Sequence, residues 1–310
     1  MNKKRNMNGL EALADKESDQ DSTSLTLNRR RWRNPWLDAF YNFRRNFSGI
    51  IGVTILVVMT VLHVGAPLFT PMDPAEMNSG EILQPPSVEH PFGTDHFGRD
   101  LFSRVLYGGR ISLLVATVVT LVTTVTGVVL GALSGYYPKL DTLIMRVMDL
   151  VMAFPVMILA ILSVAILGPQ FFNVIMALII PVTPRTARVV RGSILSLKEQ
   201  DFVTAAQSIG VGDLRIIVRH LLPNVLPPLL VRQTYVFGIS ILIEGGLNFL
   251  GIGVQPEIAT LGSVVSEGRR FLRDMPWFSF YPGMAIALLV LGINLLGDGL
   301  RDVLDPRMKV

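Results

Sequence analysis

Long apolar runs separated by short polar stretches make up most of the sequence after residue 48. A helix needs about 20 apolar residues to cross the hydrocarbon of a bilayer. Six runs meet this requirement and predict membrane-spanning helices at Gly49–Phe69, Ile111–Tyr136, Leu143–Leu167, Phe171–Val190, Leu226–Leu250 and Phe278–Leu296. Pro181 and Pro184 interrupt the fourth run, which is tolerated where neighbouring helices satisfy the freed backbone groups. The pattern predicts an all-α integral membrane protein with six spans.

Two further segments precede the first span. Residues 1–28 are polar with mixed charge, and we expect them to form a disordered cytosolic tail. Residues 29–47 place aromatic rings at helical spacing among arginines, which is typical of an amphipathic helix at the membrane interface. The rings of this stripe are Trp32, Trp36, Phe40, Phe43 and Phe47. A transmembrane domain over residues 48–307 completes the predicted organisation.

The composition agrees with a membrane protein and indicates its orientation. Of the 310 residues, 17% are charged, whereas soluble domains have about 25%. The absence of cysteine excludes disulfides and thiolate metal sites. The connections on one side of the six spans carry 20 Lys and Arg residues, and those on the other side carry six. The positive-inside rule therefore predicts that both termini and the connection at residues 185–224 face the cytosol.

A patterned polar segment, residues 196–223, lies between the fourth and fifth spans. Ser196 and Glu199 have capping-box spacing and predict the start of a short helix. Gly210 predicts the end of that helix, and Asp213 predicts the cap of a second one that ends at Pro223. Each helix has one predicted apolar face, formed by Phe202, Ala205, Ala206 and Ile209 in the first and by Leu214, Ile217, Val218 and Leu221 in the second.

Polar side chains inside the predicted spans are candidates for function, because ionisable groups at depth are costly. Glu244 and Asn248 lie one turn apart in the fifth span, where they either line a translocation path or bond to neighbouring helices. Arg232 lies near the cytosolic mouth of the same span. We interpret the remaining positions as structural: an ion pair of Arg146 with Asp149, a hydrogen-bonded His63, and close helix packing at Gly127, Gly131 and Gly135.

The sequence contains no catalytic constellation. It lacks the Gly-x-x-x-x-Gly-Lys-Ser/Thr loop that binds ATP phosphates, and it lacks His-Glu-x-x-His and Gly-x-Ser-x-Gly. A DNA-binding helix-turn-helix at residues 206–219 is disfavoured, because membrane spans flank it and no soluble domain carries it. We therefore predict no enzymatic activity, cofactor or nucleic-acid partner. We also predict no metal site, because the group between the first two spans has turn spacing: His90, Asp95, His96 and Asp100.

Four blocks of the sequence carry a family resemblance. One is an Ala pair followed by Gly and then by Leu-Pro, and it consists of Ala205, Ala206, Gly210, Leu222 and Pro223. The others are His90–Ser112, Phe249–Pro256 and Asn294–Arg307. Together they resemble the dipeptide/oligopeptide/nickel permeases of bacterial ABC importers, specifically the second, C-type subunit. Two features differ from the family: Thr204 replaces a frequent acidic residue, and the stretch after Gln255 lacks a second Pro and a Trp-Gly.

The resemblance implies the type I ABC-importer permease fold in a bacterial inner membrane. It implies a second, dissimilar permease subunit, two ATP-binding subunits that hold ATP and Mg, and an extracytoplasmic substrate-binding protein. Di- or oligopeptides are the expected substrates, with nickel chelates or glutathione-like peptides as alternatives. The candidates for the translocation path are then Arg232, Glu244 and Asn248. The segment 196–223 is implied to couple to an ATP-binding subunit, through Phe202, Thr204, Ala205, Ala206, Gln207, Ile209, Gly210 and Asp213.

A self-contained secondary transporter or channel is the alternative function. Such proteins usually contain internal repeats or broken spans around charges at the membrane midplane. The sequence shows no convincing repeat, and a self-contained transporter has no evident use for the helix pair at residues 196–223. Dependence of transport on an ATPase subunit separates the two functions.

Overall fold

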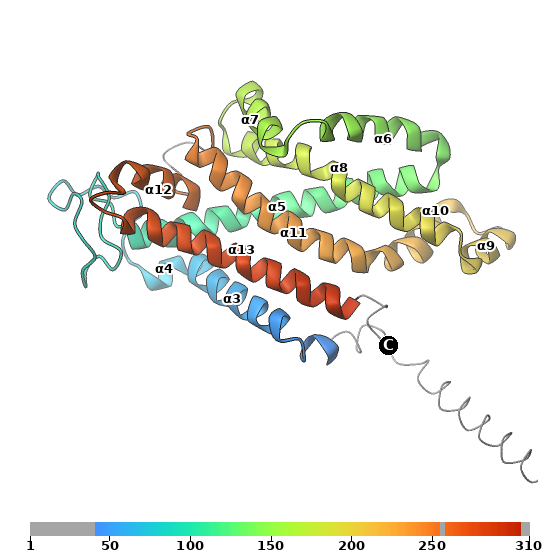
Figure 1. Ribbon diagram of the computed structural model, residues 1–310, viewed down its shortest axis with the longest axis horizontal. Coiled ribbons are helices and arrows are strands. Elements are labelled where there is room, and N and C mark those ends of the chain that lie inside the picture. Colours follow the sequence, from blue (N-terminus) through green and yellow to red (C-terminus); the bar gives the residue numbers. More distant parts are fainter. Residues whose placement is uncertain (1–40, 255–257, 305–310) are drawn as a thin grey trace, which may run out of the picture. The chain divides into compact units, whose positions relative to one another are not determined.

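The computed structural model describes residues 41–254 and 258–304, and these residues are mainly helical (Figure 1). The predicted tail and residues 29–40 of the predicted interfacial helix lie outside the described part. The described part contains no β-sheet, only an isolated antiparallel bridge between Thr94 and Asp100. The α-helices are α3 (Phe47–Val64), α4 (Ala66–Phe69), α5 (Leu101–Tyr136), α6 (Pro138–Met152), α7 (Val156–Leu167), α8 (Phe171–Lys198), α9 (Asp201–Ser208), α10 (Asp213–Arg215), α11 (Leu222–Phe249), α12 (Leu261–Gly268) and α13 (Trp277–Leu304).

The predicted spans correspond to long apolar helices. Five stretches are long and apolar enough to cross a membrane: α3, α5, α8, the continuous stretch from α10 through α11, and α13. A sixth is formed by α6 and α7 together. The helix α5 packs along α8 and α11, while α11 packs along α13, and α13 in turn packs on α3. The largest buried apolar cluster lies where α5, α7, α8 and α11 meet.

The third predicted span is broken rather than continuous. The axes of α6 and α7 differ by 92° at the break between Met152 and Val156. Proline disfavours helical backbone in the residue before it, so Phe154 cannot easily continue α6 into Pro155. Pro155 itself has an extended ψ of 134° and precedes the first residue of α7. The span predicted at Leu143–Leu167 is therefore formed by two helices that meet at a bend, rather than by one continuous helix.

Two other boundaries differ from the predictions. The helix α5 begins at Leu101 rather than Ile111, because Asp100 caps it by accepting a 2.7 Å hydrogen bond from the Ser103 amide. Pro223 does not end the second helix predicted in residues 196–223. It occupies the first turn of α11, where the missing N–H is not needed. A short π-helical turn, Ile216–Leu221, joins α10 to α11.

Close packing of α5 against α8 depends on glycines. The sequence predicted close helix packing at these positions, and the structure shows that α8 is the partner. A Cβ atom at Gly131 would lie 2.5 Å from the Ala187 carbonyl oxygen and 2.6 Å from the Cβ atom of Val190. A Cβ atom at Gly127 would lie 2.6 Å from Cγ2 of Thr186, and one at Gly135 would lie 3.0 Å from the Cβ atom of Ile194. Small residues let helix backbones approach each other where lipid provides no hydrophobic driving force. The Gly-x-x-x-Gly spacing is thus confirmed as a packing feature.

We predict that Gly131→Leu lowers the thermal stability of the purified protein, because overpacking a tight interface costs about 1–3 kcal/mol. Thermal unfolding in detergent measures the effect. Gly192→Leu is the matched control, since a Cβ atom at Gly192 of α8 would meet nothing within 4 Å. Equal unfolding temperatures for the two variants would contradict the assigned packing.

Candidate functional site

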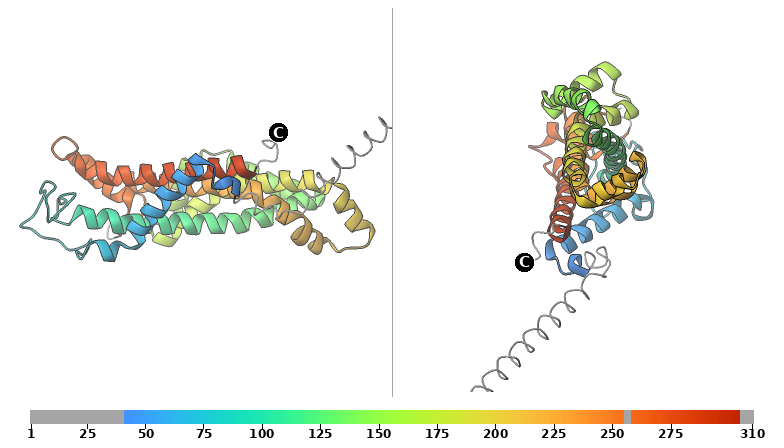
Figure 2. Two further views of the ribbon diagram at one scale, coloured as in Figure 1. Left: turned by 90° about the horizontal axis from the view of Figure 1, so that it is seen from below. Right: turned by 90° about the vertical axis from the view of Figure 1, so that its right-hand side faces the viewer.

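The coupling segment predicted at residues 196–223 forms a compact unit beyond the ends of α5 and α8. The helix α8 continues through Ser196 to Lys198, and α9 starts after Gln200, whose side chain makes no capping hydrogen bond. The predicted capping box of Ser196 and Glu199 is therefore wrong, because no proline or glycine interrupts α8 after Gly192 and its helical pattern continues through Ser196. Figure 2 shows α9 and its connection to α10 at one end of the helices.

The helix α9 has two apolar faces rather than one. Val203 and Ala206 are buried. Phe202 and Ile209 are 38% and 81% exposed, and Ala205 is exposed beside them. The sequence predicted Ala206 on the same face as Phe202 and Ile209. Ala206 lies at the border of that stripe, where the 100° step of the helix turns it inward next to Val203.

The turn after α9 is a Schellman motif. Gly210 has a φ of +78°, a left-handed conformation that glycine adopts without strain. Its amide donates to the Gln207 carbonyl at 2.9 Å, and the Val211 amide donates to the Ala206 carbonyl at 3.1 Å. The predicted helix stop at Gly210 is confirmed, and the hydrogen bonds fix the direction of the chain from α9 toward α10.

Polar contacts attach this unit to the end of α5. The hydroxyl group of Tyr136 donates to Asp213 Oδ1 at 2.8 Å. Lys198 Nζ donates to the Tyr136 carbonyl at 2.8 Å and lies 5.0 Å from the centre of its ring. The predicted cap at Asp213 is thus wrong, because Gly212 occupies the N-cap position and the Asp213 carboxylate binds Tyr136 instead. The unit has a fixed position relative to α5 and α8.

Several apolar side chains of the unit are exposed on its outer surface, beside polar and charged ones. We call this apolar group the docking face, and its members are exposed on the end of the protein although each is apolar: Phe202, Ala205, Ile209, Leu214 and Val218. The inward side chains of the same unit, which include Val203, Ile216 and Leu221, pack in one cluster with Val190 and Ile194 of α8. Contiguous apolar residues on an exposed surface mark a site of interaction. The buried cluster holds the docking face in place.

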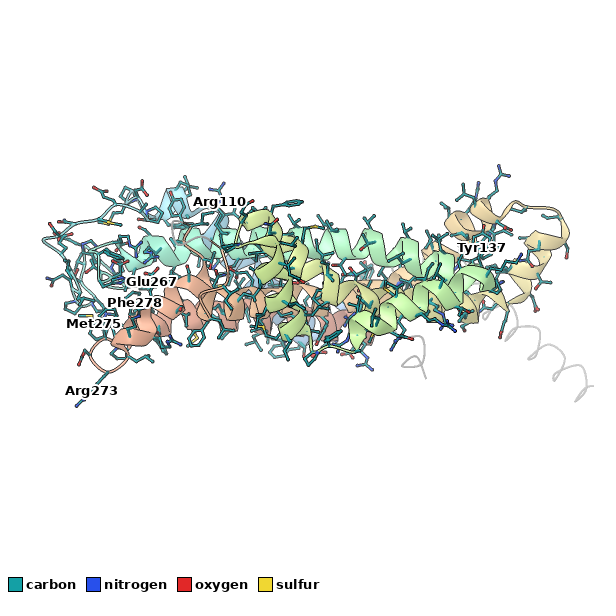
Figure 3. All side chains as sticks on the ribbon, turned by 90° about the horizontal axis from the view of Figure 1, so that it is seen from above. Arg110, Tyr137, Glu267, Arg273, Met275 and Phe278 are labelled. Atoms are coloured by element: carbon teal, nitrogen blue, oxygen red, sulfur yellow. The ribbon has the colours of Figure 1, made fainter. Side chains whose placement is uncertain are left out.

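At the opposite end an ionic cluster joins α5, α12 and the loop between α4 and α5. Arg104 donates to Asp95 at 2.5 Å and to Glu267 at 2.6 and 2.9 Å. Arg99 also donates to both carboxylates, at 2.6 and 2.9 Å. Burial alone raises the pKa of Asp95, but Arg104, the amides of Arg99 and Phe97, and the Arg99 guanidinium lower it below its usual value. Figure 3 shows Glu267 at this end and Tyr137 at the other.

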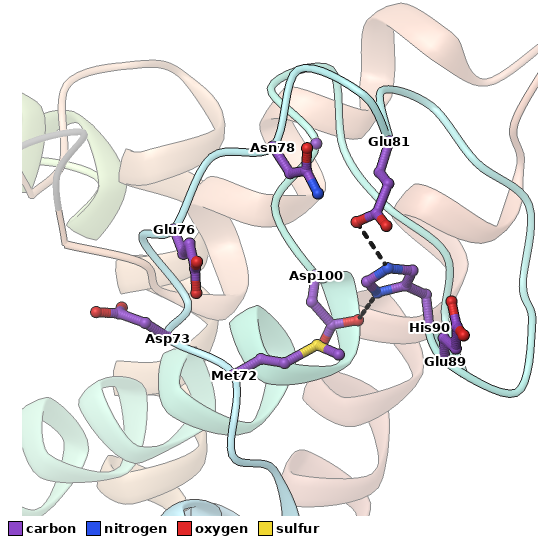
Figure 4. Close-up of a pocket in the computed structure, with 9 residues that line it drawn as sticks. Met72, Asp73, Glu76, Asn78, Glu81, Glu89, His90 and Asp100 are labelled. Carbon is purple, nitrogen blue, oxygen red and sulfur yellow. Dashed lines mark hydrogen bonds and ion pairs between the residues drawn. The ribbon is translucent and has the colours of Figure 1, made fainter.

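The predicted group of His90, Asp95, His96 and Asp100 divides between two networks. Asp95 belongs to the ionic cluster, and the ring of His96 lies against Phe97 and Phe271. His90 lies between Asp100 and Glu81, at 2.9 and 3.2 Å (Figure 4). Burial opposes protonation of His90, but hydrogen bonds and charge from Asp100 and Glu81 prevail and raise its pKa. These residues line a cavity of about 230 Å³ together with Asp73, Glu76 and Glu89.

The polar residues predicted within the spans make contacts inside the subunit. Glu244 is 1% exposed, accepts a 3.0 Å hydrogen bond from the Ser112 hydroxyl group, and accepts another from the Asn248 amide group. Asn248 Oδ1 accepts from the Val254 amide at 2.8 Å. These bonds join α11 to α5 and to the loop after α11. Arg232 is half-buried and lies 4.8 Å from the centre of the Tyr235 ring.

Two structural predictions about single residues have different outcomes. Nδ1 of the buried His63 lies 3.2 Å from the Leu106 carbonyl oxygen, which confirms a hydrogen-bonded role. Asp149 forms its ion pair with Arg188 of α8 at 2.5 Å, so the predicted pair with Arg146 was wrong. The i, i+3 spacing allowed that pair, but α8 packs on α6 and brings Arg188 to the same carboxylate. Sequence analysis also missed the partners Glu267 and Tyr136, because nothing in the local pattern links residues so far apart.

Comparison with known families gives two matches. The family described as "Binding-protein-dependent transport system inner membrane component" matches residues 127–310. The family described as "N-terminal TM domain of oligopeptide transport permease C" matches residues 34–86. Among solved structures, the inward-facing MetNI methionine ABC transporter has a TM-score of 0.54 at 19% identity, covering 64% of this chain and 96% of that chain. This likeness shows the fold, which is that of an ABC-importer permease.

Several curated proteins are similar over most of their length. A putative peptide transport system permease protein of Brucella suis is 49% identical over 86% of this chain and 90% of the relative. The dipeptide transport system permease protein DppC of Alkalihalophilus pseudofirmus is 43% identical over 89% and 91%. The oligopeptide transport system permease protein OppC of Bacillus subtilis is 35% identical over 88% and 90%. The chain therefore belongs to the inner membrane components of binding-protein-dependent transport systems, as a C-type permease subunit of an ABC importer.

Proposed function

We propose that this subunit forms half of a translocation path for di- or oligopeptides and passes motion from an ATPase to that path through α9. The relatives DppC and OppC are a dipeptide and an oligopeptide permease, and this supports a peptide substrate. A nickel chelate or a glutathione-like peptide is the alternative substrate. We place the spans in the bacterial inner membrane, and the excess of Lys and Arg in residues 1–47, 185–224 and 301–310 supports a cytosolic position for α9 and both termini.

The proposed assembly contains four kinds of subunit. A second, dissimilar permease completes the path, and two ATP-binding subunits hold ATP and Mg on the cytosolic side. A substrate-binding protein delivers peptide from outside. The spans behave as one body that rocks between inward-open and outward-open states, because packed helix interfaces have discrete arrangements rather than deforming continuously. This chain contributes no ATP-binding loop of its own.

The docking face is the observation that carries this proposal. Ile209 is 81% exposed and Leu214 is 75% exposed, and side chains of this kind fit a groove in a partner subunit. Thr204 and Gln207 are exposed polar residues of α9, and we propose that they contact the partner subunit beside the docking face. Since Asp213 and Lys198 attach the unit to α5, a force applied to the docking face reaches the spans. A self-contained transporter or channel leaves this exposed surface without a function.

Of the three candidates for the path, Arg232 is the one that we retain. Its side chain is half-buried, and its charge is a costly feature in a span unless it faces a hydrated route. Glu244 and Asn248 are buried and bonded within the subunit, so we assign them a bracing role between α5, α11 and the loop that precedes α12. This assignment favours one of the two interpretations that the sequence left open.

A cysteine at Gln207 tests the coupling proposal, and the natural chain has no cysteine to interfere. In membranes that contain the whole transporter, we expect Gln207→Cys to form a crosslink to an engineered cysteine in the ATP-binding subunit. ATP should change the yield, because the nucleotide moves the two subunits relative to each other. Met77→Cys, which is 63% exposed in the loop before α5, is the control and should give no adduct. If the two cysteines form no crosslink in the intact transporter, the result would favour a self-contained transporter or channel.

Charges on the docking face should uncouple transport without unfolding the subunit. We expect Phe202→Asp and Ile209→Asp to reduce ATP-dependent uptake at least about tenfold, because burying an unpaired carboxylate in the interface is costly. Co-purification of the ATP-binding subunit should fall in parallel. Ser208→Asp adds the same charge to α9 at an exposed position outside the docking face and should retain most uptake. Normal uptake by both docking-face variants would remove α9 from the coupling role.

The bracing role of Asn248 predicts a loss of stability. Asn248→Ala leaves the buried Val254 amide without an acceptor, and such a group costs about 1–3 kcal/mol. The unfolding temperature of the purified complex measures the loss. Asn224→Ala is the control, because the Asn224 side chain is exposed and, among the described residues, bonds only to the His220 carbonyl. If Asn248→Ala instead reduced peptide uptake with unchanged stability, Asn248 would belong to the path.

A further inference from the structure

A second cavity, of about 450 Å³, opens near the N-terminal end of α5. One wall is formed by arginines of α5 and of the loop before it, and the remaining walls are mainly apolar. Its lining includes Arg99, Arg104, Arg110, Ile111, Leu114 and Ile258. Cavities of about 300–1,000 Å³ with a few convergent polar groups are the usual size for small-ligand sites. The size and lining therefore suit a small molecule with an anionic group and an apolar part.

The charges around this cavity do not cancel. Arg99 and Arg104 are matched by the two carboxylates of Asp95 and Glu267. Arg110 forms no ion pair with any residue that the structure describes, and it is exposed. Figure 3 shows Arg110 toward the same end of the helices as Glu267. One guanidinium group is thus left over for a negatively charged ligand.

Arg104 supplies a second, independent observation. Its side chain is 1% exposed, and its Nε atom has no hydrogen-bond partner among the described residues. A buried donor left unpaired costs about 1–3 kcal/mol, so such atoms usually have a function or a missing partner. Arg104 lines the same cavity as Arg110, so an anionic ligand there lies beside two guanidinium groups.

The position along α5 matches the entry side of the proposed path. This helix has 36 residues and is thus about 54 Å long, whereas the hydrocarbon core of a bilayer is about 30 Å thick. Its ends therefore project from the bilayer. Leu101 starts the helix, so Arg110 lies within its first three turns, at the end opposite to Tyr137 and α9. A substrate that enters from outside passes this level before it reaches the spans.

We infer that this cavity binds the C-terminal carboxylate of an incoming peptide, with Arg110 as the residue that recognises the charge. Guanidinium groups bind carboxylates through paired, charge-assisted hydrogen bonds. The apolar walls formed by Ile111, Leu114 and Ile258 accommodate the last side chain of the peptide, which lies next to that carboxylate. The inference rests on the proposed peptide function and adds a specificity determinant to it: a free carboxyl terminus.

Thiol protection in the whole transporter tests this assignment directly. Leu114 lines the cavity and is 48% exposed, so Leu114→Cys should react with a maleimide in membranes. We expect L-alanyl-L-alanine to slow that reaction and its C-terminal amide to have no effect at the same concentration. Adding Arg110→Gln should raise the dipeptide concentration for half-protection at least about tenfold, and Arg110→Lys should raise it less, since one charge remains. Met77→Cys, outside the cavity, should show no protection.

Three results would overturn the assignment. Equal protection by the acid and the amide would show that the carboxylate is not recognised, and unchanged protection in Arg110→Gln would exclude this arginine. The third concerns lipid, whose phosphate has similar chemistry. If phosphatidylglycerol in nanodiscs slows the labelling through Arg110 and the dipeptide does not, the cavity binds a lipid headgroup. Uptake of radiolabelled dialanine by the unmodified transporter is measured in parallel, and its absence would count against the peptide function rather than against this site alone.

Discussion

Contact between the backbones of α5 and α8 is the interaction on which the other features depend. Lipid is as apolar as the side chains of the spans, so helices gain little by hiding from it and are held by close packing. Gly127, Gly131 and Gly135 allow that packing along one face of α5. Because α5 extends from the ionic cluster to Tyr136, and α8 leads directly into α9, the pair connects the two ends of the subunit.

Charge pairing has a different function at the end near Arg104. Buried ions are costly to desolvate, and pairing them often only offsets this cost. We therefore expect the ionic cluster to position the parts of the chain that it joins more than to stabilise the fold. It consists of Asp95, Arg99, Arg104 and Glu267. It fixes α12 and the loop before α5 to the first turn of α5. Ser112 and Glu244 add a second attachment a few turns further along the same helix. With both in place, the walls of the arginine-lined cavity hold their relative positions.

Sequence patterns predicted features that depend on neighbours in the chain. Apolar runs located five spans and a sixth that is bent between α6 and α7, glycine spacing marked α5 as a closely packed helix, and Gly210 located the end of α9. The errors were of another kind. At Pro155 the effect of proline outweighs the apolar helical pattern and the helix bends. At Ser196 the helical pattern outweighs the capping-box spacing and α8 continues. The burial of Ala206 and the ion pair of Asp149 with Arg188 depend on which helix packs against each residue. Arg104 and Glu267 meet only after the chain has folded, so their cluster had no signature in the sequence.

The ends of α5 offer a physical reason for coupling ATP use to substrate entry. If an ATPase subunit moves the docking face, Tyr136 and the buried cluster around Ile194 transmit the motion to α5 and α8 together. A helix bends little over the roughly seven turns between Arg110 and Tyr136 when its hydrogen bonds are complete, so displacement at Tyr136 requires displacement at Arg110. A carboxylate held at Arg110 then acts on the same rigid element from the opposite end. Two ligands that act on one element influence each other's binding equally, as linkage requires. On the proposed function, a bound peptide and an ATPase subunit would therefore be coupled through α5 without any contact between them.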